Sequence, residues 1–255
     1  MTDRAFTTLI TRANPSVPGC PYATIKTYIR DAAIKVCERT LAYRYEIPLF
    51  DLLPGVHEYT FDRPSNTDVQ AVFGALMNSS PIKLLTLDQA IERYPEWADL
   101  YSGEDADELW SETPSMALDN PEYGEELFDA ASVFVLPDSI IATAATPQAM
   151  CQISPQNFIV VPLPDDTTYS MRVFVALKPT RDATGMETKV FDLLEDVILH
   201  KALEDLLVLP GVPWTNPDLA MYHSKKFHFL LQEKRANANL GHVRGSLTAR
   251  MRPLA

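Results

Sequence analysis

The densest group of chemically reactive side chains in this sequence is a run of carboxylates. Between Pro95 and Asp129 there are twelve acidic residues and no Lys or Arg. Four of them lie almost side by side, at Glu104, Asp105, Asp107 and Glu108. Carboxylate oxygens bind Ca²⁺ and Mg²⁺, so a metal-dependent enzyme is one interpretation. The segment lacks the alternating Asp/Asn residues with Gly that calcium loops commonly use. We therefore interpret it as a solvated acidic surface.

The other residue types that perform chemistry show no motif. His223 and His228 are five residues apart and would point to different faces of a helix, so we interpret both as surface or interface residues. Cys20, Cys37 and Cys151 lack the paired spacing of metal ligands, and we expect reduced thiols. The nine glycines form neither a phosphate-binding loop nor a nucleophile elbow. We expect no enzymatic activity, no metal and no cofactor.

The charge of the chain is unevenly distributed. The net charge is −12, and twelve of the 34 acidic residues lie in the acidic segment, which leaves 22 against the 22 Lys and Arg elsewhere. The last fifteen residues contain His242, Arg244, Arg250 and Arg252 and no acid. An acidic insert and a basic tail indicate two surfaces with different partners. We expect no sequence-specific DNA binding, no secretion signal and no membrane span.

The clearest structural element is a helical hairpin near the C-terminus. One helix is predicted over Glu187–Leu209 and ends at Pro210 and Gly211. The next begins with Asn216 as N-cap and Pro217 at the first helical position. Its turn and second helix contain three aromatic residues that we expect to pack: Trp214, Tyr222 and Phe227.

The first helix of this hairpin is apolar on more than one face, so it must be covered on more than one side. Two interpretations remain open. It is the central core helix of a monomer, or one of its faces meets a neighbouring subunit.

Elsewhere, apolar spacing predicts two further helices and a set of strands. The helices cover 22–43 and 87–94, and the strands cover 56–61, 69–77, 132–136, 150–153, 158–162 and 168–177. This order does not alternate, so we expect an α+β fold: a helical bundle from the N- and C-terminal helices with an inserted small antiparallel β-domain and extended terminal arms. The expected divisions are 1–47 (arm and first bundle helix), 48–180 (β-rich domain with the acidic insert 95–129), 181–240 (hairpin) and 241–255 (extended basic tail).

Several segments taken together resemble head–tail adaptor proteins of tailed bacteriophages, of the tail-tubular-protein-A type. The segments that resemble this family are Tyr28–Thr40, Leu52–Phe61, Val175–Thr180, Leu209–Pro217, Ala220–Phe227 and Asn237–Gly241. They span most of the chain except roughly Pro95 to Asp129. The resemblance depends on their order and spacing rather than on one diagnostic motif.

The resemblance implies a non-enzymatic virion protein, assembled in the host cytoplasm, that forms a ring, usually twelvefold, between the portal vertex and the tail. Its partners would be other copies of the chain, the portal protein and a tail nozzle, tail tube or fibre protein. Double-stranded DNA would pass through the ring without sequence-specific contact. A stopper or tail-completion ring of the same virion neck is the alternative.

On this hypothesis, ring assembly would bury apolar faces of the helices 22–43 and 187–209, and the basic tail would dock in the portal. The residues assigned to portal or subunit contact are Trp214, Tyr222, Phe227, His242, Arg244, Arg250 and Arg252. The acidic insert would either contact a tail component or line the rim of the channel, where its charge would repel DNA phosphates.

Overall fold

The computed structural model describes residues 3–56, 58–94 and 144–240. The chain divides into two compact units. The first comprises Met1–Arg44, Pro64–Gln70 and Ala176–Ala255, and the second comprises Tyr45–Arg63 and Ala71–Val175. The chain passes from one unit to the other several times, so neither is a simple insertion into a continuous segment.

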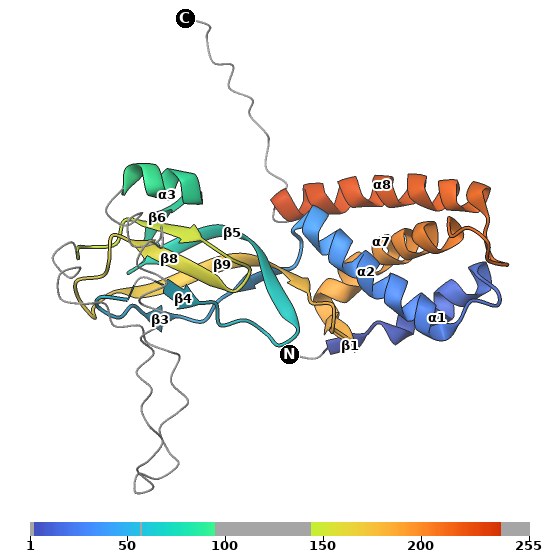
Figure 1. The fold of residues 1–255 in the computed structure, drawn as a ribbon, viewed down its shortest axis with the longest axis horizontal. Helices are drawn as coiled ribbons and strands as arrows, with labels where there is room; N and C mark the ends of the chain where they lie inside the picture. The colour runs from blue at the N-terminus through green and yellow to red at the C-terminus, as the bar shows by residue number, and fades with distance from the viewer. Residues whose placement is uncertain (1–2, 57, 95–143, 241–255) are drawn as a thin grey trace, which may run out of the picture. The chain divides into compact units, whose positions relative to one another are not determined.

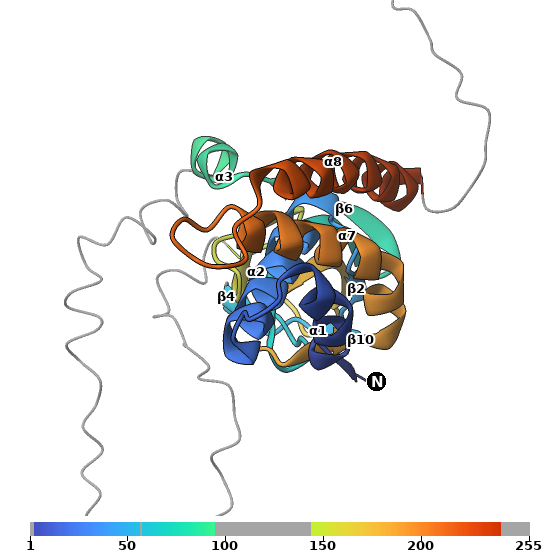
Figure 2. The ribbon, with the colours of Figure 1, turned by 90° about the vertical axis from the view of Figure 1, so that its right-hand side faces the viewer.

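The first unit is mainly helical. Its elements are β1 (Asp3–Ala5), α1 (Thr7–Ala13), a 3-10 turn (Asn14–Ser16), α2 (Tyr22–Thr40), β10 (Gly185–Glu187), α7 (Thr188–Leu207) and α8 (Pro217–Leu240). Strand β1 pairs antiparallel with β10. Helix α7 contacts α1, α2 and α8, and both views show it beneath α8 (Figures 1 and 2). It is therefore the central helix of this unit.

Helix α2 shows how the apolar spacing produces this packing. Its buried residues recur every three or four positions and so form one face: Ile25, Ile29, Ala32, Ala33, Val36, Cys37 and Thr40. The helix ends where Leu41 adopts a left-handed conformation with φ 52°, and its backbone N–H bonds to the Cys37 carbonyl at 2.9 Å. This is the conformation that commonly ends helices.

The second unit contains most of a large, curled sheet of eight strands, of which a few residues belong to the first unit. The strands are β2 (Arg44–Glu46), β3 (Phe50–Asp51), β4 (Glu58–Thr60), β5 (Thr67–Met77), β6 (Ser80–Leu85), β7 (Ala149–Gln152), β8 (Asn157–Val161) and β9 (Ser170–Pro179). Their order is β2-β9-β5-β6-β7-β8-β4, and β3 also pairs with β9. Strands β6 and β7 are parallel, with Leu84 opposite Met150.

Side chains alternate between the two faces of this sheet, and each face has its own cluster. On one face, Ala149, Cys151, Ile159 and Val161 pack with Ala90 of helix α3 (Leu87–Arg93). On strand β8, Phe158 alternates with these residues and is the centre of an aromatic cluster. Its ring centroid lies 4.7 Å from that of Phe61, 5.6 Å from Tyr59 and 5.9 Å from Phe50.

The predicted fold class is wrong. The protein is a mixed α/β structure with a large curled sheet and, in the described residues, five α-helices, rather than a helical bundle with a small antiparallel β-domain. The prediction underestimated the sheet because β2 and β3 have only three and two residues. Such strands are held by their partners rather than by a pattern of their own. It also missed β6 and its parallel pairing with β7.

The expectation of an extended N-terminal arm is also wrong for the described residues. Thr7–Ala13 form helix α1, in which Leu9, Ile10 and Ala13 are buried. Apolar residues at positions 6, 9, 10 and 13 have helical spacing. The prolines that follow, at positions 15, 18 and 21, favoured the prediction of an extended arm over this short helix.

Several local predictions are confirmed. Helices α2, α3, α7 and α8 and strands β4, β5, β7, β8 and β9 lie within three residues of their predicted bounds. Thr86 caps α3 through a reciprocal capping box with Gln89, in which its side chain accepts from the Gln89 backbone. The predicted strand 132–136, the acidic insert and the basic tail lie outside the described residues.

Candidate interaction surface on the C-terminal hairpin

The turn between α7 and α8 is held by its own backbone and side chains. Gly211 has φ +74°, a conformation that glycine adopts without strain. The Thr215 hydroxyl donates to the Val212 carbonyl at 2.9 Å. The Asn216 side chain accepts a hydrogen bond from the Leu219 backbone N–H at 3.0 Å, which confirms the predicted N-cap. The start and direction of α8 are therefore fixed locally.

Helix α7 has no large apolar surface left for a neighbour. The buried residues occupy several of its faces, and all are covered by its own chain: Val190, Phe191, Leu194, Val197, Ile198, Leu199, Ala202, Leu203, Leu206 and Leu207. Of the two interpretations that the sequence left open, the structure therefore supports a core helix within one subunit. The buried face of α2 is covered in the same way, so ring assembly is not needed to bury it.

Phe227 lies on the inner side of α8 and is only 1% exposed. The Lys201 ammonium lies 5.3 Å from its ring centroid and the Arg39 guanidinium 6.0 Å. Lys201 also binds Glu204 at 3.2 Å and Asp205 at 2.9 Å. Phe227, which was assigned to an interface, therefore joins α2, α7 and α8 within one chain and is a packing residue.

The outer side of α8 presents apolar side chains to solvent. Met221, Tyr222 and Phe229 are 54%, 51% and 66% exposed. Tyr222 and Phe229 are seven residues apart and lie on one side of the helix, with Lys225 and Lys226 between them and also exposed. We call Met221, Tyr222, Lys225, Lys226 and Phe229 the α8 face. It combines exposed aromatic rings with positive charge, on a helix fixed at its start and packed on its inner side.

Trp214, the remaining described aromatic residue of the predicted contact set, lies in the turn and is half-buried. Its Nε1 is buried and has no hydrogen-bond partner within the described part of the chain. Its half-buried position in the turn agrees with the expectation that it packs, and nothing places it on the α8 face.

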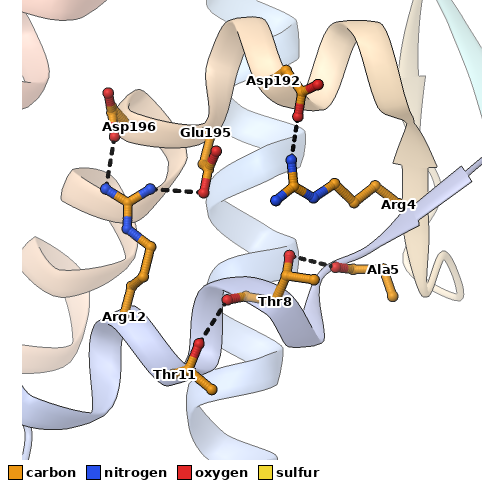
Figure 3. A network of polar contacts seen from close by, with 8 residues as sticks. All are labelled: Arg4, Ala5, Thr8, Thr11, Arg12, Asp192, Glu195 and Asp196. Atoms are coloured by element: carbon orange, nitrogen blue, oxygen red, sulfur yellow. Dashed lines mark hydrogen bonds and ion pairs between the residues drawn. The ribbon is translucent and has the colours of Figure 1, made fainter.

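The N-terminal segment is held against α7 by two arginines (Figure 3). Arg12 on α1 donates to Glu195 at 2.7 Å and to Asp196 at 2.9 Å, and Arg4 on β1 pairs with Asp192. The hydrogen bonds that Arg12 donates to Asp196 and Glu195 raise the pKa of its guanidinium. These pairs are partly exposed, so each contributes only a little stability. Together they fix the position of α1.

A histidine pair joins α7 to α8. The Nδ1 atoms of His200 and His223 lie 2.8 Å apart, and the ring centroids 5.0 Å. His223 is 7% exposed, so its interpretation as a surface residue is wrong, while His228 is exposed. Burial lowers the pKa of both His200 and His223, and the pKa of His223 is lowered further by His200.

His200 was not among the predicted site residues, although its position relative to the turn is a signal. His200 lies eleven residues before Gly211 and His223 twelve residues after it. In two antiparallel helices joined at Gly211, residues at about equal distances from the turn along the chain lie next to each other.

The remaining predicted contact residues, His242, Arg244, Arg250 and Arg252, lie outside the described residues. So do the four neighbouring acidic residues Glu104, Asp105, Asp107 and Glu108. In residues 3–56, 58–94 and 144–240 no three or more His, Cys, Asp or Glu side chains are grouped so that they could bind a metal ion. Among the helices described, none has the length and hydropathy to cross a membrane.

Comparison of the chain with models of protein families and with curated protein sequences gives no match.

Proposed function

We propose that this chain is a structural subunit of a bacteriophage neck, a head–tail adaptor that forms a homo-oligomeric ring between portal and tail. The observation that supports this most is the α8 face. Three large apolar side chains, each at least half exposed, stand on a helix fixed by its cap and its buried inner side. Apolar side chains gathered on one surface in this way are typical of sites that contact another protein.

The composition of the α8 face also fits a contact between proteins. Aromatic residues and Met are enriched in the centres of interfaces, where they supply most of the binding energy. Lys225 and Lys226 would lie at the edge of such a contact and face carboxylates of the neighbour. When one surface binds a different surface of the next copy, the assembly closes into a ring if the rotation permits.

The resemblance to adaptor proteins supplies the position in the virion. On that basis the basic tail 241–255 would dock in the portal protein, and the acidic insert would contact a tail component or line the rim of the channel. A twelvefold ring is the stoichiometry that the family implies.

The mass of the assembled particle tests the proposal. The full chain is measured by sedimentation velocity over a range of concentrations, alone and mixed with the portal protein of the same phage. We expect a ring in at least one of these samples. A chain that stays monomeric in both contradicts the proposal.

Substitutions then locate the contact. Phe229→Glu replaces the most exposed apolar side chain of the α8 face by a charge and should shift the distribution toward monomer. The matched control is Ile91→Glu on helix α3 of the second unit, where Ile91 is also exposed, at 38%. If both variants assemble as the unmodified chain does, the α8 face is not the contact surface.

A further inference from the structure

We propose that His200 and His223 form an acid-sensitive catch that ties helix α8 to helix α7 and releases it when both imidazoles are protonated. The two Nδ1 atoms lie 2.8 Å apart, within hydrogen-bonding distance. Both belong to one chain, so the inference holds whether or not the chain assembles into a ring.

The geometry dictates the protonation states. At 2.8 Å, one Nδ1 must have a hydrogen and the other must offer its lone pair, so the two neutral rings adopt different tautomers. A first proton binds to the free Nε2 of the donor ring and leaves the Nδ1–H···Nδ1 bond intact. A second proton can bind the acceptor ring only at its Nδ1. It breaks the hydrogen bond and places two cationic rings in contact.

The surroundings oppose protonation more than they favour it. Both rings are partly buried, and burial favours the neutral form. Near His200, the Asp196 carboxylate favours the protonated imidazole, but Arg12 already binds this carboxylate. The positive charge of Lys226 on α8 disfavours the protonated imidazole. Two charged residues of α2 contact the hairpin: Lys35 pairs with Asp205, and Arg39 lies over the Phe227 ring.

The direction of the pH effect follows from these pKa shifts. Folding lowers the pKa of both histidines, so the open hairpin binds more protons than the closed one below the ordinary histidine value of about 6.5. The contribution of the pair is therefore complete above this pH and is lost as the pH falls through and below it. Because the sites are coupled, the two protons bind in two macroscopic steps.

The catch lies directly beneath the α8 face. The Tyr222 ring packs edge-on against the His223 ring, with centroids 5.2 Å apart and an interplanar angle of 75°. Tyr222 is one of the exposed residues of that face. Release of His223 therefore removes the inner support of Tyr222, so acid should disturb the surface as well as the hairpin.

Hydrogen exchange of the full chain tests the catch. Backbone protection of α8 is measured between about pH 7.5 and pH 5 and corrected for the intrinsic pH dependence of exchange. As the pH falls, the equilibrium constant for opening α8 should increase by up to about tenfold per pH unit for each proton that is bound on opening. In the double variant His200→Asn/His223→Asn this excess pH dependence should vanish. Asn is the matched replacement because its amide lies where Nδ1 lies.

The control is His228→Asn, on the exposed side of the same helix, which should retain the pH dependence of the unmodified chain. Nitrogen NMR of the unmodified protein provides a test that needs no variant. Near neutral pH one of the two rings should have a protonated Nδ1 and the other a bare one. Two rings in the same Nε2–H tautomer, or α8 protection with equal pH dependence in the double variant, would overturn the proposal. A failure of ring assembly alone would not affect it.

Discussion

Two phenylalanines of α8, two residues apart, should respond differently to substitution by Ala: one variant should lose stability and the other should lose self-association. Phe227 is 1% exposed and lies between Lys201 and Arg39, whereas Phe229 is 66% exposed. Replacing each by Ala removes the same atoms from the same helix with the same change in helix propensity. Any difference in effect therefore comes from tertiary packing.

The expected cost at Phe227 follows from its burial. Deleting a fully buried Phe side chain costs about 3–5 kcal/mol, because apolar contacts are lost and a cavity remains. The two cations contribute about 0.5–1 kcal/mol each where they are partly exposed. Lys201 keeps Glu204 and Asp205 as partners, so no unpaired charge is created. We expect about 4–7 kcal/mol in total, a large part of the roughly 5–15 kcal/mol that stabilises a typical domain.

Urea unfolding followed by circular dichroism measures this cost, and hydrogen exchange of α8 assigns it to the helical unit. Phe229→Ala should stay within about 0.5 kcal/mol of the unmodified chain, as exposed substitutions do. Self-association should show the reverse order: Phe229→Ala weakens it, and Phe227→Ala affects it only through loss of the fold. Equal losses of stability in the two variants would refute the packing described here.

Three further outcomes are expected. Gly185→Ala should detach β1 from β10, because a Cβ at Gly185 would lie 2.5 Å from the Arg4 carbonyl oxygen. The control is Gly74→Ala, where the atom nearest to the added Cβ is 4.0 Å away. Hydrogen exchange of residues 3–13 measures the loss of protection. Trp214→Phe should cost less than about 1 kcal/mol in urea unfolding, because the side chain is only half-buried and the N–H that is lost with the larger ring has no acceptor in the described structure. Cys37 should react with thiol reagents only in urea, since burial raises its pKa to about 12.

The elements that sequence could predict are those whose ends depend on neighbouring residues. Asn216 and Thr86 each begin a helix by accepting a hydrogen bond from a backbone N–H three residues along the chain, and Gly211 supplies the positive φ of the turn between α7 and α8. Their residue types therefore report the backbone conformation directly. The alternation along β9 is equally local, and it was predicted from the same kind of pattern.

The elements that sequence missed depend on partners far along the chain. Strand β6 contains Pro81 and Lys83, and it is a strand because it lies between β5 and the parallel strand β7. Its partner Ala149 lies 66 residues after Lys83. No property of the β6 sequence specifies that pairing.

In the candidate site, too, the features that depend on distant contacts could not be predicted from the sequence. Exposure of Phe229 and burial of Phe227 could not be distinguished by residue type, since both are Phe on one helix. The pairing of His200 with His223 follows from the position of the turn, yet it also requires the correct rotation of both helices. Only tertiary packing sets that rotation.

Because α7 is covered by its own chain, its apolar residues cannot contribute binding energy to a contact between ring subunits. Had one face of α7 been open, a neighbour could have buried a continuous stripe of Leu and Val. Instead, the exposed parts of Tyr222, Phe229 and Met221 together supply on the order of 300 Å². A stable interface buries about 800 Å² on each partner. The α8 face can therefore be the centre of a contact but not the whole of it, and surrounding polar surface must complete the interface. Substitution of Phe229 alone should accordingly weaken association without abolishing it, because the residues that complete the contact remain.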